Sequence, residues 1–226
     1  MIDGRQLIQN VKDEASRVGY GRALERALYD TANKVVCLRR LEIIHLTRDN
    51  LVPLDPAKHA HTTSRLATES ELCAMQAEGK AEGTWDLSDE LLEGFRAGDR
   101  CLLSFVGGKL AGYTWVHTAG RPLIYPGLRI SIPEDYAYNF AGFTLPEFRG
   151  YGLQPYRHHE ILSRPEWRDR KGMIGFVQAT NWSSRRGQSK SGYQPLGSMI
   201  LVGTQQRYTV LLSSELVKLG IRRLDA

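Results

Sequence analysis

The stretch over 145–155 constrains the fold of this 226-residue chain more than any other part of its sequence. A β-rich run over 136–145 ends at Pro146, Gly150 and Gly152 then free the backbone to curl, and a helix follows. A strand-to-helix turn of this kind points successive backbone N–H groups into one concavity at the positive end of a helix. Pyrophosphate binding is one interpretation; an exposed turn whose glycines serve geometry alone is the other.

Two common phosphate-binding motifs are excluded by the same residues. The chain has no G-x-x-x-x-G-K-[ST], and no third glycine completes a G-x-G-x-x-G. Pro155 fits the first turn of a helix predicted to run to Leu162, because a missing N–H costs nothing there. Arg149 adds a positive charge beside the glycines. The chemistry favoured at this turn is therefore anion binding by backbone amides and one guanidinium group.

Hydrophobic periodicity predicts a mixed α/β sheet in a single domain over 1–226, with a helical N-terminal arm over 1–34. One strand is predicted over 35–38 and 41–46, interrupted by Arg39-Arg40. Further strands are predicted over 101–106, 110–117, 128–132, 136–145, 173–179, 199–202 and 206–212, and helices near 68–75, 88–95, 155–162 and 183–191. Gly107-Gly108 predicts a tight hairpin, and Thr68 with Glu71 forms a capping-box pattern. Gly142, inside a strand, indicates a bulge or a close backbone approach.

The run Pro146–Gly152 (PEFRGYG) resembles, residue for residue, a motif of the GNAT superfamily of N-acetyltransferases. A second stretch fits the same family, with Asn181 at a strand end, Ser184 three residues later, and Gly192 and Tyr193 eleven and twelve later. The resemblance implies an α/β (α+β) fold. Its central sheet would be mixed and mostly antiparallel, with two splayed parallel strands and flanking helices.

The same resemblance, which covers about 35–212, implies acetyl-CoA or another acyl-CoA as cosubstrate. The strand backbone would pair with the pantetheine arm like an added strand, and the turn would bind the pyrophosphate. The implied cofactor-binding residues are Phe143, Thr144, Leu145, Arg149, Gly150, Tyr151, Gly152, Leu153, Gln154, Asn181 and Ser184. Gln154 departs from the family, which has a small residue there. Its side chain must point away from the phosphates, or the pocket is altered.

Two further departures concern proton transfer. Many family members have a base glutamate six residues before the position of Thr144, where this chain has Tyr138. A proton-donating tyrosine is frequent seven residues after the position of Asn181, where this chain has Gln188. A phenol is a poor base at neutral pH because its ordinary pKa is about 10.

The candidate catalytic residues are Tyr138, Glu134 and His117, with Asp135 nearby. Each has an ordinary surface or hydrogen-bonding role as its alternative. We expect catalysis by positioning of the amine against the thioester, with protons relayed through water.

The residues of one strand face bear on the acceptor. Tyr136, Tyr138, Phe140 and Thr144 alternate along the strand, as ordinary packing or as the wall of an acceptor pocket. The favoured function is transfer of an acetyl or other acyl group from acyl-CoA to a primary amine of a small molecule. An amino sugar is one acceptor that a polar pocket shaped by 118–134 would suit. The alternative is a non-catalytic acyl-CoA-binding or regulatory protein, favoured by the missing acid and base.

Charge and hydropathy narrow the expected partners. Thirty Lys and Arg against 25 Asp and Glu give a net charge of +5, but the basic residues are scattered and form no recognised motif. No nucleic-acid partner is therefore expected. No apolar run approaches the length that spans a bilayer, and the first residues lack the apolar core of a secretory signal, so no membrane partner is expected.

The spacing of the cysteines and histidines indicates the cellular compartment and whether a metal site is expected. Cys37, Cys73 and Cys101 are widely spaced and odd in number, which is typical of reduced thiols in a cytoplasmic protein. The pairs His59-x-His61 and His158-His159 lack a third ligand at suitable spacing, so no metal site is expected. A homodimer is left open, with the arm over 1–34 as the segment on which it would depend.

Overall fold

The computed structural model describes residues 11–12, 15–34, 36–82, 85, 87–118, 122–125, 127–204 and 207–224. Their larger sheet has eight strands in the order β10 (Tyr208–Leu212), β9 (Gln194–Gly203), β1 (Cys37–Thr47), β8 (Gly172–Gln178), β7 (Tyr136–Thr144), β4 (Lys109–His117), β3 (Arg100–Val106) and β2 (Thr62–Leu66). A smaller sheet is ordered β11 (Arg222–Leu224), β6 (Leu128–Ser131) and β5 (Leu123–Tyr125). The helices are α2 (Tyr20–Ala32), α3 (Glu69–Glu82), α4 (Asp89–Arg96), α5 (Leu153–Ser163), α6 (Trp182–Ser191) and α7 (Ser214–Lys218), with the 3-10 turns η1 (Pro146–Phe148) and η2 (Pro165–Trp167).

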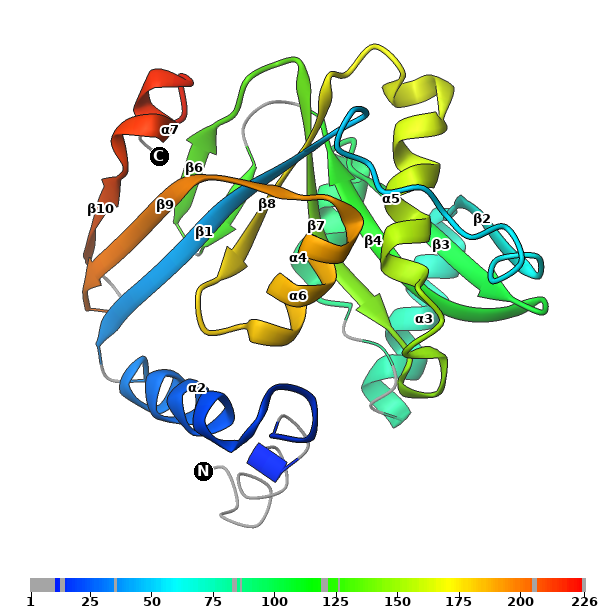
Figure 1. The fold of residues 1–226 in the computed structure, drawn as a ribbon, viewed down its shortest axis with the longest axis horizontal. Coiled ribbons are helices and arrows are strands. Elements are labelled where there is room, and N and C mark those ends of the chain that lie inside the picture. Colours follow the sequence, from blue (N-terminus) through cyan, green and yellow to red (C-terminus); the bar gives the residue numbers. More distant parts are fainter. Residues whose placement is uncertain are drawn as a thin grey trace.

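Strands β7 and β8 are parallel neighbours that pair over three residues and then diverge (Figure 1). Tyr136–Tyr138 stand in register with Gly172–Ile174. Beyond this point β8 remains paired with β1, and β7 remains paired with β4. The other described pairings in the larger sheet are antiparallel. The predicted mixed, mostly antiparallel sheet with two splayed parallel strands is therefore confirmed.

A bulge in β7 lies just beyond the point of divergence. The register of β7 on β4 shifts between Tyr113 and Trp115, so that Ala141 and Gly142 lie opposite the single residue Thr114. Ala141 has a positive φ of 44°, and both bulge residues are exposed. The bulge indicated by Gly142 is confirmed. Such an extra residue bends a strand and interrupts the alternation of its faces.

The bulge corrects the expectation that Thr144 shares a face with Tyr138 and Phe140. Before the bulge, the rings of Tyr138 and Phe140 stack with centroids 5.0 Å apart. After it, Phe143 packs into the aromatic cluster under α3 and α4. Thr144 faces α5 instead, where its hydroxyl accepts a hydrogen bond from Arg157 at 3.0 Å.

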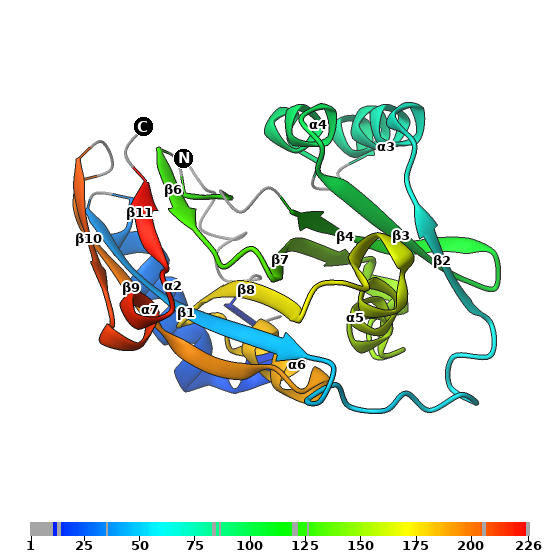
Figure 2. The same cartoon turned by 90° about the horizontal axis from the view of Figure 1, so that it is seen from above.

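Separate elements cover different regions of the larger sheet (Figure 2). Helices α3 and α4 lie over β3 and β4, with Leu72 and Trp115 in their shared core. The smaller sheet lies on the same side over β1 and β9, where Ile130 and Leu201 are buried. Helices α5 and α6 lie on the opposite side, and Ile161 anchors α5 there. Near the divergence of β7 and β8, one face of the sheet therefore has α3 and α4 to one side and the smaller sheet to the other. The opposite face has α5 and α6.

Several local predictions are confirmed. Gly107 and Gly108 join β3 to β4 with φ of 56° and 78°. The backbone N–H of Thr68 donates to the Glu71 carboxylate at 2.9 Å, and the Glu71 N–H donates back to the Thr68 hydroxyl at 3.4 Å. These short-range signals succeed because each depends on residues at most four apart.

Other predictions were wrong or incomplete. The strand predicted over 35–38 and 41–46 is present as β1, but it has no interruption, because Arg39 and Arg40 lie within it. Arg39 stacks over Tyr125 of the smaller sheet, while the backbone N–H of Arg40 donates to the Tyr29 hydroxyl of α2. Strands β2, β5 and β11 and helix α7 were not predicted. Within the predicted helical arm over 1–34 the structure has α2, whereas Leu7 and Ile8 lie outside the described residues. No helix among the described residues is long and apolar enough to cross a membrane.

Gly172 provides a test of the strand packing at the divergence. It stands between β1 and β7, and a Cβ on it would overlap the carbonyl oxygen of Leu46. We expect Gly172→Ala to lower the free energy of unfolding by about 2 kcal/mol or more, measured by urea denaturation. Gly175→Ala is the matched control, because its new Cβ would meet its nearest neighbour at 3.6 Å. Equal stability of the two variants would contradict this packing.

Candidate active site

The predicted phosphate turn connects β7 to α5 through η1. Gly150 and Gly152 both have positive φ, 90° and 74°, and Gly152 is the residue before the first turn of α5. The helix begins at Leu153, two residues earlier than predicted. Arg149 donates from Nε to the carbonyl oxygen of Thr144 at 3.4 Å, which holds its exposed guanidinium beside the turn. The turn therefore has the backbone form that exposes amide groups at a helix N-terminus to an anion.

The long connection between β1 and β2 brings a second cation to this turn. A Cβ on Gly152 would lie 3.4 Å from Lys58 Nζ and 3.4 Å from His59 Cε1. The connection is held along α5, because His59 packs on Tyr156 at 5.2 Å and the His159 ring contacts the Val52 carbonyl oxygen at 2.5 Å. Sequence reasoning missed Lys58, since no local motif links it to a turn almost a hundred residues later.

Gln154 is larger than the residue usual at this position of the resembled family, so the direction of its side chain matters. Its amide lies against α6, where a Cβ on Gly187 would overlap Gln154 Oε1. The side chain therefore occupies space left free by a glycine on the neighbouring helix.

Asn181 and Ser184 are together at the start of α6, as the second motif predicts. The Asn181 side chain accepts a hydrogen bond from the Ser184 N–H at 3.2 Å and one from the Ser183 hydroxyl at 3.2 Å. Arg26 of α2 donates to the same oxygen at 3.5 Å. In this structure Asn181 therefore serves as the N-cap of α6.

Buried polar groups gather between α5 and α6. The ring of His158 packs edge-on against Tyr193 at 5.1 Å. Among the described residues, no partner accepts or donates at His158 Nδ1, the Tyr193 hydroxyl or Gln188 Oε1. Burial lowers the pKa of His158 to about 3 and raises the pKa of Tyr193. Both groups are therefore neutral near pH 7. Gln188 lies on α6, at the position where a tyrosine is frequent in the family that the sequence resembles.

The three candidate catalytic residues lie in different environments. Tyr138 is buried, and its burial, with a smaller effect of Asp99, raises the pKa of its phenol. The Glu134 side chain is exposed, and its carbonyl oxygen accepts a hydrogen bond from Arg170. His117 stands opposite Tyr138 in the β4–β7 register.

His117 has the arrangement of an oriented base. Its Nδ1 contacts Asp99 Oδ1 at 2.5 Å, and both side chains are largely buried. Its Nε2 is buried and has no hydrogen-bond partner among the described residues. Asp99 follows α4 and was missed from the sequence, because the contact exists only when the hairpin of β3 and β4 brings it to His117. A carboxylate on one ring nitrogen fixes the ring and leaves the other nitrogen for a proton.

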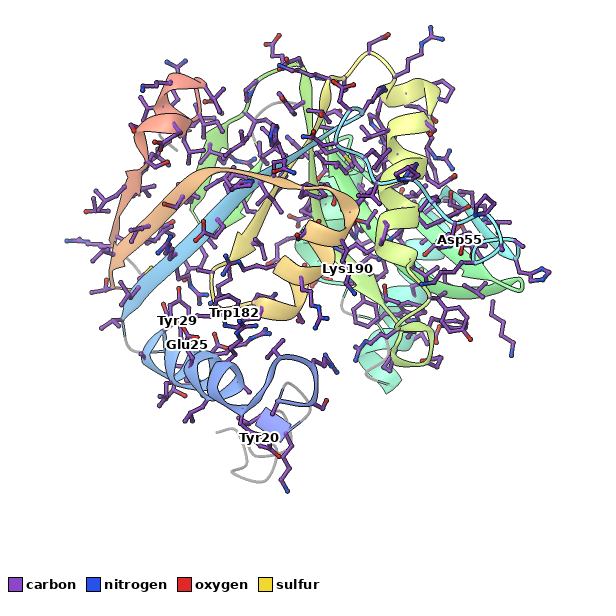
Figure 3. The ribbon with its side chains drawn as sticks, viewed as in Figure 1. Tyr20, Glu25, Tyr29, Asp55, Trp182 and Lys190 are labelled. Atoms are coloured by element: carbon purple, nitrogen blue, oxygen red, sulfur yellow. The ribbon has the colours of Figure 1, made fainter. Side chains whose placement is uncertain are left out.

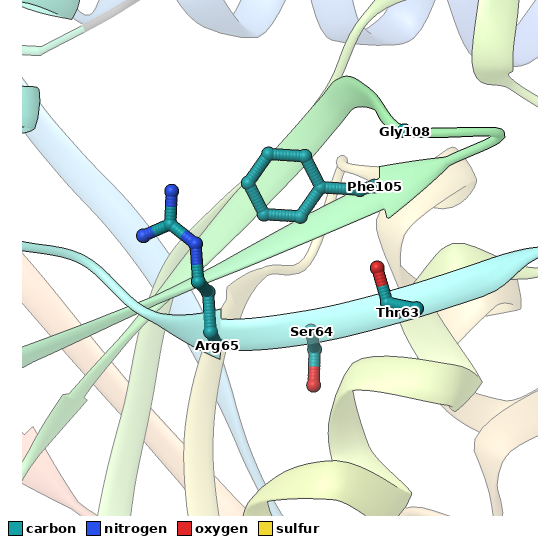
Figure 4. A pocket seen from close by; sticks show the side chains of 5 residues that line it. All are labelled: Thr63, Ser64, Arg65, Phe105 and Gly108. Atoms are coloured by element: carbon teal, nitrogen blue, oxygen red, sulfur yellow. The ribbon is translucent and has the colours of Figure 1, made fainter.

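A metal site or another surface hollow would be an alternative place for acid–base chemistry. No group of three metal-ligating side chains occurs among the described His, Cys, Asp and Glu residues. A shallow hollow of about 320 Å³ lies on strands β2 and β3, lined by Thr63, Ser64, Arg65, Phe105 and Gly108 (Figure 4). It lies on the edge of the sheet away from the divergence. Arg65 covers Phe105 there and pairs with Glu71, so the hollow offers no acid–base group for the same chemistry.

Known proteins resemble this chain in structure rather than in sequence. No family model matches the sequence, and no curated protein matches it. Solved structures do match. Several of the matching structures are described as GNAT-family acetyltransferases. A GCN5-related N-acetyltransferase from Kribbella flavida is 14% identical with a TM-score of 0.47, covering 78% of this chain and 63% of its own.

Two further acetyltransferase structures also match with TM-scores below 0.5. A GNAT-family acetyltransferase from Novosphingobium aromaticivorans is 16% identical with a TM-score of 0.49, covering 75% of this chain and 66% of its own. An acetyltransferase from Clostridium acetobutylicum, whose structure includes acetyl-CoA, is 16% identical with a TM-score of 0.40, covering 59% and 90%. The chain thus spans less than two thirds of the length of the first two proteins. Its activity is therefore inferred from its own residues.

The buried His158 predicts a pH dependence of stability. Its folded pKa of about 3 lies below the unfolded value of about 6.5, so the unfolded chain binds this proton more readily between the two values. Stability should therefore fall as the pH drops through this window and be fully present above it. We expect His158→Gln to reduce the loss of unfolding free energy between pH 7.5 and pH 5, measured with urea. The exposed His61→Gln is the control; equal pH dependence in both variants would contradict the assignment.

Proposed function

We propose that the chain transfers an acetyl or other acyl group from acyl-CoA to a primary amine of a small molecule. The observation that carries this proposal is the divergence of β7 and β8 directly before the phosphate turn at the start of α5. Beyond Tyr138 the side of β7 that faces β8 has no strand paired to it within the described sheet. An extended pantetheine arm is the kind of ligand that adds to such an edge, with its phosphates at the helix N-terminus.

We call the space between β7 and β8 beyond Tyr138 the wedge. The residues around it suit the phosphates of an acyl-CoA. Gly150 and Gly152 give the turn its left-handed backbone, while Arg149 and Lys58 supply positive charge from two sides. Phe143–Leu145 and Tyr151–Gln154 would line the site as the resemblance implies. We assign Asn181 and Ser184 to the α6 end of the same wedge, where they cap the helix.

We propose His117 as the group that accepts the proton of the attacking amine, with Asp99 as its positioning residue. The bound acyl-CoA would supply the thioester. Asp99 orients the imidazole through Nδ1, so Nε2 is the atom that would take the proton. Tyr138 would act as a neutral phenol beside it, because burial raises its pKa. Glu134, exposed at the start of β7, could act only through water.

The acceptor side is proposed from the aromatic face of the two splayed strands. Tyr138 stacks on Phe140 and packs edge-on against Phe176 at 5.4 Å. This floor adjoins His117 through the β4–β7 register. Flat apolar rings beside a base suit a small amine whose carbon skeleton can pack on them, such as an amino sugar.

A second function is favoured by one observation. Gln188 of α6, which cannot donate a proton usefully, stands at the position where a tyrosine is frequent in the resembled family, and its Oε1 has no hydrogen-bond partner among the described residues. A non-catalytic acyl-CoA-binding or regulatory protein would need the cofactor site but no acid at this position. Acyl-CoA binding without thiol release over a broad amine panel would favour this alternative.

Partners and compartment remain predictions. No nucleic-acid or membrane partner is proposed, and the cytoplasmic location is consistent with the free thiols of Cys37, Cys73 and Cys101. A homodimer through the arm would use the exposed apolar side chains of Tyr20, Leu24 and Leu28 along α2.

The cofactor site can be tested by calorimetry with coenzyme A. We expect binding near the micromolar range, about −8 kcal/mol. Gly152→Val should abolish it through backbone strain and blocked approach. Lys58→Gln should weaken it roughly tenfold by removing a charged contact. Lys109→Gln, an exposed lysine in the β3–β4 hairpin, should leave it unchanged. Undiminished affinity in both Gly152→Val and Lys58→Gln would refute the site.

The proton acceptor can be tested by steady-state kinetics of free-thiol release. His117→Gln should lower kcat about a hundredfold or more while leaving the KM for acyl-CoA unchanged, since loss of a general base removes a contact made in the transition state. Asp99→Asn should lower kcat by less and should also spare KM. Tyr138→Phe should cost less than tenfold. A loss in Tyr138→Phe larger than that in His117→Gln would reverse the two roles.

A further inference from the structure

A second concentration of positive charge lies where α2 packs against the start of α6. A cavity of about 520 Å³ lies between α6 and the N-terminal arm. It is lined by Arg17 and Val18, which precede α2, by Arg22 of α2, and by Trp182, Arg185 and Arg186 of α6. Figure 3 shows Glu25 and Tyr29 on the side of α2 that faces Trp182, while Tyr20 lies on the opposite side of the helix. The cavity therefore forms only because the N-terminal arm is docked on the domain.

Trp182 holds two of these guanidinium groups in place. Cζ of Arg22 and Cζ of Arg185 each lie 4.6 Å from the centroid of the indole ring. The indole N–H donates to the Glu25 carboxylate at 3.3 Å, and Arg185 also donates to the carbonyl oxygen of Ala179 at 3.0 Å. A guanidinium stacked on an aromatic face keeps edge N–H groups for a further ligand, and its side chain is already ordered.

Neutralising carboxylates are scarce around these cations. Arg22, Arg185 and Arg186 form no ion pair with any carboxylate that the structure describes, and Glu25 is engaged by Trp182. The N-terminal end of α6, a helix of ten residues, adds the positive end of its dipole to the same space. The cavity thus combines ordered donors with an excess of positive charge.

We propose that this cavity is a second phosphate-binding site, separate from the turn over 149–154. Guanidinium forks match phosphate oxygens in bidentate fashion, and the volume lies within the range of small-molecule sites, about 300–1,000 Å³. The ligand is a phosphate ester or diphosphate carried by a small molecule. Because α6 directly follows β8, one source is the 3′-phosphate of an acyl-CoA in the wedge, which rests on the proposed function. The other source is an independent phosphorylated molecule, which does not.

Calorimetry on the full chain with inorganic pyrophosphate at low ionic strength tests the site. We expect two bound ions per chain, one lost in Gly152→Val and the other in Arg22→Gln/Arg186→Gln, with affinity falling roughly tenfold or more for each guanidinium removed. Arg168→Gln removes the same charge from an exposed arginine beside Asp169 and should change nothing. The single variant Arg186→Gln leaves both stacks on Trp182 intact and controls for undocking of α2.

The outcomes separate this site from the phosphate turn. Binding that survives Gly152→Val and disappears on adding Arg22→Gln/Arg186→Gln supports the cavity, even if the turn proves not to bind. Wild-type pyrophosphate binding in Arg22→Gln/Arg186→Gln overturns it. Coenzyme A and dephospho-coenzyme A then identify the source: an effect of the arginine variants on the first ligand alone assigns the 3′-phosphate. Pyrophosphate binding in the presence of saturating coenzyme A assigns an independent ligand.

Discussion

The side chain of Arg157 joins the helix after the phosphate turn to the strand before it. It is buried and donates to the hydroxyls of Thr144 at 3.0 Å and Ser104 at 3.1 Å. Burial lowers its pKa to about 10, so it remains charged near pH 7. Gly112 leaves room for it, because a Cβ there would lie 2.9 Å from Nη1. An unpaired buried hydroxyl costs about 1–3 kcal/mol, so the two hydroxyls and the guanidinium hold one another in place.

This contact also depends on the bulge in β7. If β7 alternated regularly through Ala141 and Gly142, Thr144 would lie on the aromatic face with Tyr138 rather than beneath α5. The bulge thus gives one strand two functions in sequence: an aromatic floor before it and an anchor for α5 after it. The phosphate turn follows the anchor by only a few residues, so its position relative to the splayed strands is set by a fixed strand and a fixed helix.

The sequence predicted the parts of the site whose signals are local. The turn at Gly150 and Gly152, the bulge near Gly142 and the hairpin at Gly107-Gly108 each depend on backbone conformations that few residues adopt. Lys58 and Asp99 could not be found in this way, because they reach the site through a long connection and a strand pairing. Strands of three residues, such as β5 and β11, carry too short a pattern to be recognised. Both pair with the same strand, β6.

The position of β1 has a consequence for synthesis of the chain. β1 precedes the other described strands, and it pairs on one side with β8 and on the other with β9, both far along the chain. Its buried Ile43 and Leu46 therefore lie in a strand that cannot pair until β8 and β9 have been made. Such long-range pairing slows folding and leaves an apolar strand open to other chains in the meantime. We therefore expect residues 37–47 to be open to aggregation with other chains until synthesis has passed β9.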